Sequence, residues 1–133
     1  MSNWGVTKGT EFEKAIEDLS KGEISGASMY SSLAYLAKER GLDEVSEKLM
    51  NIAVDELRHA GLYAVLNGQV DDAIFGMLEK MAPVERGGVE KLQQFAKSLR
   101  AVGLESVSEQ IELVAFDEGC HGETLEKLIK DFK

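Results

Sequence analysis

The second half of the 133-residue chain repeats the first. The segment GLDEVSE at 41–47 returns as GLESVSE at 103–109 (103 − 41 = 62). Each copy has the length of a helical hairpin, and one hairpin cannot bury its apolar stripe alone, so the two copies must pack face to face. The repeat therefore predicts a single domain over 1–133, built from half-repeats at about 10–67 and 72–130.

Apolar residues recur at steps of three and four along four segments, the spacing that keeps side chains on one face of an α-helix. The chain has only one proline and is rich in helix-forming residues. We expect an all-α four-helix bundle made of two repeated hairpins. Pro83 either opens the third helix, leaving 71–81 as a short crossover helix, or kinks a longer helix.

Composition excludes several classes of protein. Lys and Arg number 15 against 24 Asp and Glu, a net charge of -9 that disfavours a nucleic-acid partner. A single Cys excludes an internal disulfide framework and a four-thiolate metal site within one chain, and it fits a reducing cytosol. No apolar stretch approaches the roughly 18 residues that span a bilayer, and the start lacks the zones of a signal peptide. We expect a cytoplasmic protein with no membrane partner.

Acidic and imidazole side chains interrupt the centres of the apolar stripes, where the pattern calls for core residues. Both histidines of the chain follow a glutamate by three residues, and side chains at that spacing share a helix face with Cβ atoms about 5–6 Å apart. A carboxylate and an imidazole can then converge on one ion. The candidate metal ligands are Glu23, Glu56, His59, Glu85, Glu118 and His121.

Four carboxylates in one bundle interior repel one another, and two divalent cations cancel their charge. Carboxylate and imidazole ligands without thiolates favour iron or manganese, and a Glu plus a Glu-x-x-His from each helix pair is a known two-metal design. We expect two iron ions, with manganese or a mixed metal pair as the alternative. A buried polar network without metal is the structural alternative.

Two stretches carry a resemblance to a known family. GEISGASMYSSLAYLAKERGL followed by DELRHA, and later FAKSLRAVGLESVSEQIELVAFDEGCHGETL, resemble the two helix pairs of the rubrerythrin group in the ferritin-like superfamily. The resemblance covers nearly the whole chain and implies that the six candidate residues hold two irons, bridged by Glu56 and Glu118. It also implies that Tyr30, two turns beyond Glu23, hydrogen-bonds near the metals and assists catalysis. The repeat counterpart of Tyr30 is Leu92.

The chain departs from that family in its electron supply and its ligand count. It has none of the paired Cys-x-x-Cys motifs of the rubredoxin-like domain, so we expect an external donor such as a rubredoxin-like protein or a reductase. Gly88 stands where rubrerythrins carry an extra Glu, which makes the six-ligand set similar to the ferroxidase centre of bacterioferritin. Leu57 and Arg58 leave no Met to bind haem, and no fifth helix is present to build a cage, so bacterioferritin itself is not expected.

Three functions fit these residues. The first is a peroxidase that reduces hydrogen peroxide to water in oxidative-stress defence. The second is a ferroxidase or iron-handling protein that oxidises Fe(II) with oxygen. The third is a non-catalytic helical interaction module stabilised by metal.

The spacing between the half-repeats affects assembly. Ferritin-like bundles join the second and third helices by a long crossover, but about three residues follow Gly68 here if the third helix starts near Asp72. We therefore expect a homodimer that can exchange helix pairs, so that each site draws one half-repeat from each chain. Cys120 lies one position, about 100°, from His121, so we expect it off the ligand face, as a packing residue rather than a redox thiol.

Overall fold

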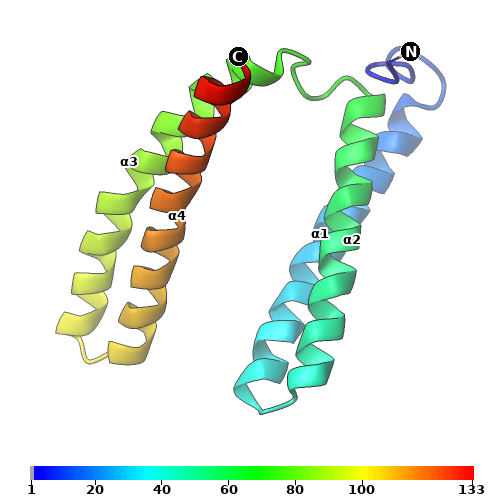
Figure 1. Ribbon diagram of the computed structural model, residues 1–133. Helices are drawn as coiled ribbons and strands as arrows, with labels where there is room; N and C mark the ends of the chain where they lie inside the picture. Colours follow the sequence, from blue (N-terminus) through cyan, green and yellow to red (C-terminus); the bar gives the residue numbers. More distant parts are fainter. Residues whose placement is uncertain (1) are drawn as a thin grey trace. The chain divides into compact units, whose positions relative to one another are not determined.

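A computed structural model describes residues 2–133, which contain helices and no strands. The helices are α1 (Glu13–Glu39), α2 (Asp43–Leu66), α3 (Ile74–Ala101) and α4 (Glu105–Phe132). The helix α1 packs against α2, and α3 against α4 (Figure 1). The all-α prediction and the two hairpins are confirmed. The chain divides into two compact units at Asp72/Ala73, called here the first and the second hairpin.

The two hairpin turns have the same geometry. Gly41 and Gly103 follow α1 and α3 with φ of 74° and 84°, a left-handed conformation that glycine adopts without strain. The next backbone N–H closes each turn. The N–H of Leu42 donates to the carbonyl of Ala37 at 2.9 Å. The N–H of Leu104 donates at 3.0 Å to the carbonyl of Leu99, which is the repeat counterpart of Ala37. The repeated segments thus fold alike.

A serine that recurs in both half-repeats connects the two helices of each hairpin by a hydrogen bond near the turn. The Ser46 hydroxyl donates to the Ala34 carbonyl at 2.8 Å, and the Ser108 hydroxyl donates to the Ala96 carbonyl at 2.7 Å. Both the donors and the acceptors are repeat counterparts of one another. The same hydrogen bond therefore recurs in both half-repeats, at the interval at which the sequence repeats.

Small side chains form the contact inside each hairpin, and they let the helices approach closely. The buried members of this seam include Ala27, Ala34, Ala37, Ala53 and Ala60 in the first hairpin, and Ala82, Ala96, Ala115 and Gly122 in the second. Larger apolar side chains stay exposed, among them Leu19 and Ile52 in the first hairpin and Phe95 and Val114 in the second. Each hairpin therefore keeps an apolar surface beyond its own core.

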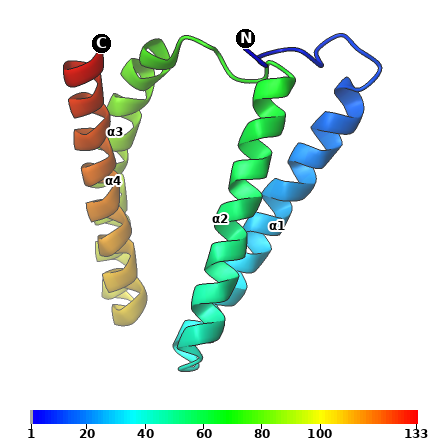
Figure 2. The ribbon, with the colours of Figure 1, turned by 45° about the vertical axis from the view of Figure 1, so that its right-hand side comes forward.

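Pro83 lies inside α3, which runs unbroken from Ile74. The alternative in which 71–81 forms a separate crossover helix is wrong. Proline leaves the carbonyl four residues earlier, that of Glu79, without its helical N–H partner. Both residues are exposed, so water can satisfy that carbonyl. The first turns of α3 lie at an angle to the rest of the helix in Figure 2, as expected at a proline.

The segment before α1 folds over the end of the first hairpin, which the periodicity did not predict. The N–H groups of Gly5 and Thr7 donate to the carbonyls of Val65 and Leu66, at 2.9 and 3.0 Å. The buried side chain of Asn67 donates to the Glu13 carbonyl at 2.9 Å. The two backbone bonds satisfy carbonyl groups at the open end of α2.

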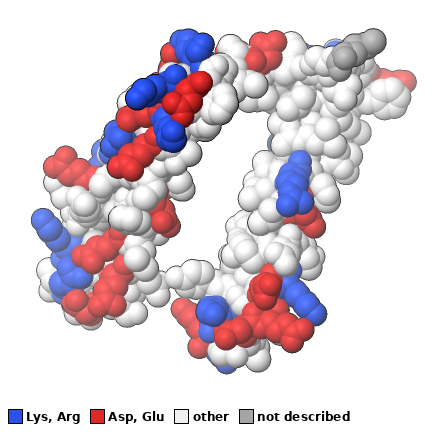
Figure 3. All heavy atoms as spheres, in the orientation of Figure 1, with Lys and Arg blue, Asp and Glu red and all other residues white. Residues whose placement is uncertain are grey.

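The two hairpins differ in where their charged side chains lie. In the view of Figure 3 they cover much of α3 and α4, whereas over α1 and α2 they concentrate toward the turn between these helices. No helix within residues 2–133 is long and apolar enough to cross a membrane.

Candidate metal centre

Three candidate ligands meet in the first hairpin. Glu23 comes from α1, and Glu56 and His59 come from α2. One ligand atom from each lies within 4.8 Å of the others. The Nδ1 atom of His59 is 3.4 Å from Oε1 of Glu23, so the imidazole reaches across from one helix to the carboxylate of the other. The predicted Glu-x-x-His spacing does bring these groups to one place.

The Oε2 atom of the Glu23 carboxylate is buried and has no hydrogen-bond partner. A buried polar atom without a partner costs on the order of 1–3 kcal/mol, and native proteins have few of them. A cation between Glu23, Glu56 and His59 would satisfy this oxygen, so the residues present fit a bound metal ion.

Gly26 makes room for the second carboxylate. A Cβ at this position would lie 3.3 Å from the carboxyl carbon of Glu56 and 3.4 Å from its Oε1. Any side chain at position 26 would press on the Glu56 carboxylate. The glycine therefore lets Glu56 lie against α1, one turn from Glu23.

The second hairpin repeats the arrangement. Glu85 of α3 and Glu118 and His121 of α4 also offer ligand atoms within 4.8 Å of one another. The Nδ1 atom of His121 lies 3.6 Å from Oε2 of Glu85. In both hairpins the first glutamate is the more enclosed group, with 19% and 23% of its side chain exposed, and the imidazole is more than half exposed.

The two glutamates of the second group interact directly. A hydrogen bond with Glu85 raises the pKa of Glu118, and burial and the charge of Glu85 raise it further. The charge of His121 opposes this shift. Two carboxylates this close disfavour each other's negative charge, and a cation between them would relieve that repulsion.

All six predicted ligands are thus gathered in two groups of three, one group in each hairpin. Each group offers two carboxylates and one imidazole, which suits one divalent cation. The joining of the two groups around a metal pair stays a prediction.

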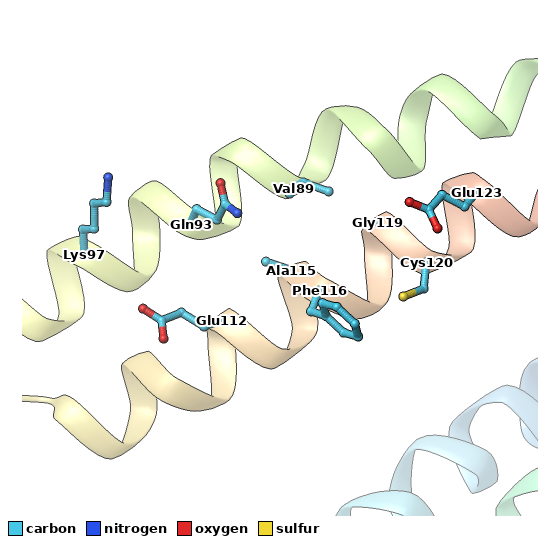
Figure 4. A pocket seen from close by; sticks show the side chains of 9 residues that line it. All are labelled: Val89, Gln93, Lys97, Glu112, Ala115, Phe116, Gly119, Cys120 and Glu123. Carbon is cyan, nitrogen blue, oxygen red and sulfur yellow. The ribbon is translucent and has the colours of Figure 1, made fainter.

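Tyr30 and Cys120 lie outside both groups. Tyr30 is half-buried on α1, two turns beyond Glu23, and its catalytic role stays a prediction. Cys120 is exposed and lines a hollow of about 690 Å³ between α3 and α4, beside Phe116 and Glu123 (Figure 4). None of the metal-ligand candidates lines this hollow.

One contact beside the second group was not predicted from the sequence. Arg86, next to Glu85, places Nε 2.5 Å and Nη2 2.7 Å from the carboxylate oxygens of Glu126. The Arg86 side chain crosses Gly122, where an added Cβ would lie 2.7 Å from its Cγ. Gly122, directly after His121, was the sequence signal for this contact, because a glycine inside a helix lets a side chain of the neighbouring helix approach closely.

Comparisons with known proteins give two relatives. Uncharacterized protein MJ0746 of Methanocaldococcus jannaschii is 30% identical over 125 residues, which cover 94% of this chain and 89% of that protein. Reverse rubrerythrin-1 of Clostridium acetobutylicum is 28% identical over 132 residues, or 96% of this chain and 72% of that protein. No protein-family model matches the chain.

These similarities agree with the helices and the carboxylate and imidazole groups. The similarity to reverse rubrerythrin-1 and the four helices fit a ferritin-like fold. The chain therefore belongs to the same family as the Methanocaldococcus jannaschii protein and is a distant homologue of a reverse rubrerythrin.

Proposed function

We propose that the protein is a non-haem di-iron oxidoreductase that reduces hydrogen peroxide to water with electrons from an external donor. The observation that supports this most is the pair of repeat-related Glu/Glu/His groups, one of which holds a buried carboxylate oxygen without a partner. The distant similarity to reverse rubrerythrin-1 agrees with it.

Charge balance favours two ions in a joined site. Four carboxylates carry four negative charges, and two divalent cations match them. Their oxygen and imidazole donors suit iron, with manganese or a mixed pair as the alternative. Iron bound there supplies the redox chemistry, one electron from each ferrous ion.

The reaction takes up two protons as well as two electrons: H₂O₂ + 2 H⁺ + 2 e⁻ gives 2 H₂O. The Tyr30 hydroxyl, half-buried two turns from Glu23, orients the peroxide or passes it a proton. Glu56 and Glu118 would hold the ions, and their carboxylates would balance the positive charge of the metals. The external donor, a rubredoxin-like protein or a reductase, then returns the two electrons.

A specific observation favours oxidation of Fe(II) by oxygen as the second candidate. Gly88 occupies the place of the extra glutamate of rubrerythrins, and no atom beyond its chain neighbours and the adjacent backbone of α3 lies within 4 Å of where its Cβ would be. The second hairpin therefore offers no seventh carboxylate at that turn. Under this alternative the same six residues bind Fe(II) as substrate and release it oxidised.

The link between the hairpins supports exchange between two chains. Residues 67–73 separate α2 from α3 and reach at most about 24 Å, whereas the 24-residue helix α2 is about 36 Å long. A ferritin-like bundle needs a crossover along its whole length. We propose a homodimer in which the first hairpin of one chain joins the second hairpin of the other.

The rates of oxidation by peroxide and by oxygen test the function. Apo-protein is loaded anaerobically with ferrous iron and mixed with each oxidant in a stopped-flow spectrometer. A reaction at least ten times faster with peroxide, repeated for several turnovers with a reduced rubredoxin, is the expected result. A faster reaction with oxygen followed by turnover of added Fe(II) would favour the ferroxidase. Bound iron that never changes oxidation state would indicate a metal-stabilised interaction module.

A further inference from the structure

The second hairpin has a side-chain contact between its helices directly beside the candidate metal ligands. Arg86 follows Glu85 on α3, and its guanidinium donates to both carboxylate oxygens of Glu126 on α4. The distances are 2.5 Å from Nε to Oε1 and 2.7 Å from Nη2 to Oε2. Two parallel bonds from a planar guanidinium fix an orientation as well as a distance. The contact therefore fixes how α3 is turned against α4 at this level.

Gly122 leaves a notch in α4 for the Arg86 side chain. It follows His121 and is buried. A Cβ at this position would lie 2.7 Å from Cγ of Arg86 and 3.6 Å from its Nε, and the first of these distances is shorter than real Cβ contacts. The aliphatic part of Arg86 therefore lies directly on α4. One side chain thus connects the residue after Glu85 to the residue after His121.

The remaining contact between α3 and α4 fixes the helices only weakly near these ligands. The buried seam residues Ala82 and Ala115 are small, so they let the helices approach but form shallow ridges. The other arginine that pairs across the two helices, Arg100 with Glu112, is 15 residues from Glu85 (100 − 85 = 15), or about 22 Å along α3. The spacing beside the ligands therefore depends on Arg86.

The first hairpin cannot form this contact. The repeat interval places Ile24, Ala60 and Ala64 at the equivalent positions. The isoleucine side chain has no polar atom, and the two alanines provide neither a notch nor a carboxylate. The first hairpin nevertheless gathers its own Glu/Glu/His group. The arginine contact is therefore not required for the repeat to fold, and it makes the two ligand groups inequivalent.

We propose that Arg86 is a positioning residue for a metal ion bound by the Glu/Glu/His group of the second hairpin, an inference that rests on the proposed metal centre. By fixing α3 against α4, Arg86 holds the Glu85 carboxylate of one helix beside the His121 imidazole of the other, with 3.6 Å between Oε2 and Nδ1. The paired side chains of Arg86 and Glu126 are 46% and 50% exposed, so their ion pair adds little to the stability of the fold. Its effect is expected in metal affinity.

Titration with cobalt(II) tests this role without any turnover. The visible absorption of bound Co²⁺ depends on its ligand geometry, and competition with a chelator gives the affinity of each ion. We expect Arg86→Ala to change the absorption and to weaken one of two Co²⁺ ions by about tenfold, the lower end of the range for residues that support metal ligands. Arg100→Ala, the matched control, loses hydrogen bonds to Glu105 and Glu112. It should lower the melting temperature by a similar amount and keep both ions.

Gly122→Ala separates positioning by Arg86 from a direct effect on the neighbouring His121. In the otherwise unchanged chain the added methyl must displace the Arg86 side chain, so we expect the same loss of Co²⁺ affinity as in Arg86→Ala. In an Arg86→Ala chain the methyl meets the backbone nitrogen of residue 86 at 3.6 Å, an ordinary contact. Gly122→Ala should then cause no further loss.

Full affinity for both Co²⁺ ions in Arg86→Ala would overturn the proposal. An equal loss in Arg100→Ala would also overturn it, because general destabilisation would then be the cause. So would a further loss when Gly122→Ala is added to Arg86→Ala. Circular dichroism shows that each variant is folded. Failure of the wild-type chain to bind Co²⁺ would contradict the metal centre itself and this inference with it, so the two failures are distinguishable.

Discussion

The space above Gly26 controls where the Glu56 carboxylate can lie. Gly26→Ala would put a Cβ 3.3 Å from the carboxyl carbon of Glu56, whereas the Cβ of Gly88→Ala meets no atom within 4 Å beyond its chain neighbours and the adjacent backbone of its own helix. Both changes favour the helix by up to about 1 kcal/mol, because glycine is a poor helix former. We expect Gly26→Ala to weaken metal binding several-fold and Gly88→Ala to leave it unchanged, as measured by calorimetric titration of the metal. Equal affinities in the two variants would contradict the position of Glu56 as a ligand.

Tyr30 should affect the reaction rather than metal binding. Tyr30→Phe removes only the hydroxyl from a half-buried ring, so the ligand groups and both metals should stay in place. We expect oxidation of the loaded protein by peroxide to slow by about a hundredfold, the lower end of the range for a lost proton-transfer group. Stopped-flow absorbance measures this rate. A variant as fast as the wild type would leave Tyr30 with a packing role only.

The sequence predicted which residues gather but not how they interact. Two histidines, each three residues after a glutamate, identified both groups because that spacing fixes a shared helix face. The unpartnered Oε2 of Glu23 and the effect of Glu85 on the pKa of Glu118 depend on side-chain rotation and enclosure across two helices. Periodicity within one helix contains no such information.

At the scale of the helix pair, Arg86 and Glu126 connect α3 to α4 across the surface. The hydrogen bond and charge of Arg86 lower the pKa of Glu126 below 4.5. A carboxylate with a lowered pKa stabilises the fold above its unfolded-state pKa, and that contribution is lost as the pH falls through the lowered value. Glu126→Gln should therefore lower the melting temperature slightly at pH 7, and the difference should shrink below pH 4.5.

Thermal unfolding followed by circular dichroism between pH 3 and 7 measures this difference. Glu109→Gln, another exposed glutamate of α4, is the control and should match the wild type. A deficit of Glu126→Gln that stays constant down to pH 3 would show that the pair is not the cause.

The helices themselves were largely predictable, and the exceptions have physical causes. The repeat located both hairpins because GLDEVSE and GLESVSE carry the same glycine turn. Pro83 could not be assigned, because a proline is compatible with a helix start and also with a helix interior whose free carbonyl reaches water. The N-terminal segment was missed because its backbone bonds to Val65 and Leu66 leave no periodic trace.

At the scale of the whole molecule, exchange of hairpins between chains makes a complementation prediction. His59→Ala damages one group and His121→Ala the other. If two chains exchange hairpins, a mixed dimer of these variants contains one site with both histidines, whereas a site built within one chain always lacks one. We expect the mixed dimer, purified through two different tags, to regain about half of the wild-type metal content. Metal content equal to the mean of the two variants alone would contradict the exchange.

The metal pair is tested most directly by counting metal ions and measuring their coupling. Apo-protein is titrated anaerobically with ferrous iron, and a parallel sample with manganese is studied by electron paramagnetic resonance. We predict two ions per chain with the spectrum of a coupled pair, and sharply lower occupancy in Glu56→Ala and His121→Ala with their helices intact. Fewer than two ions, two uncoupled ions, or unchanged binding in either variant would contradict a two-metal centre built from the two half-repeats.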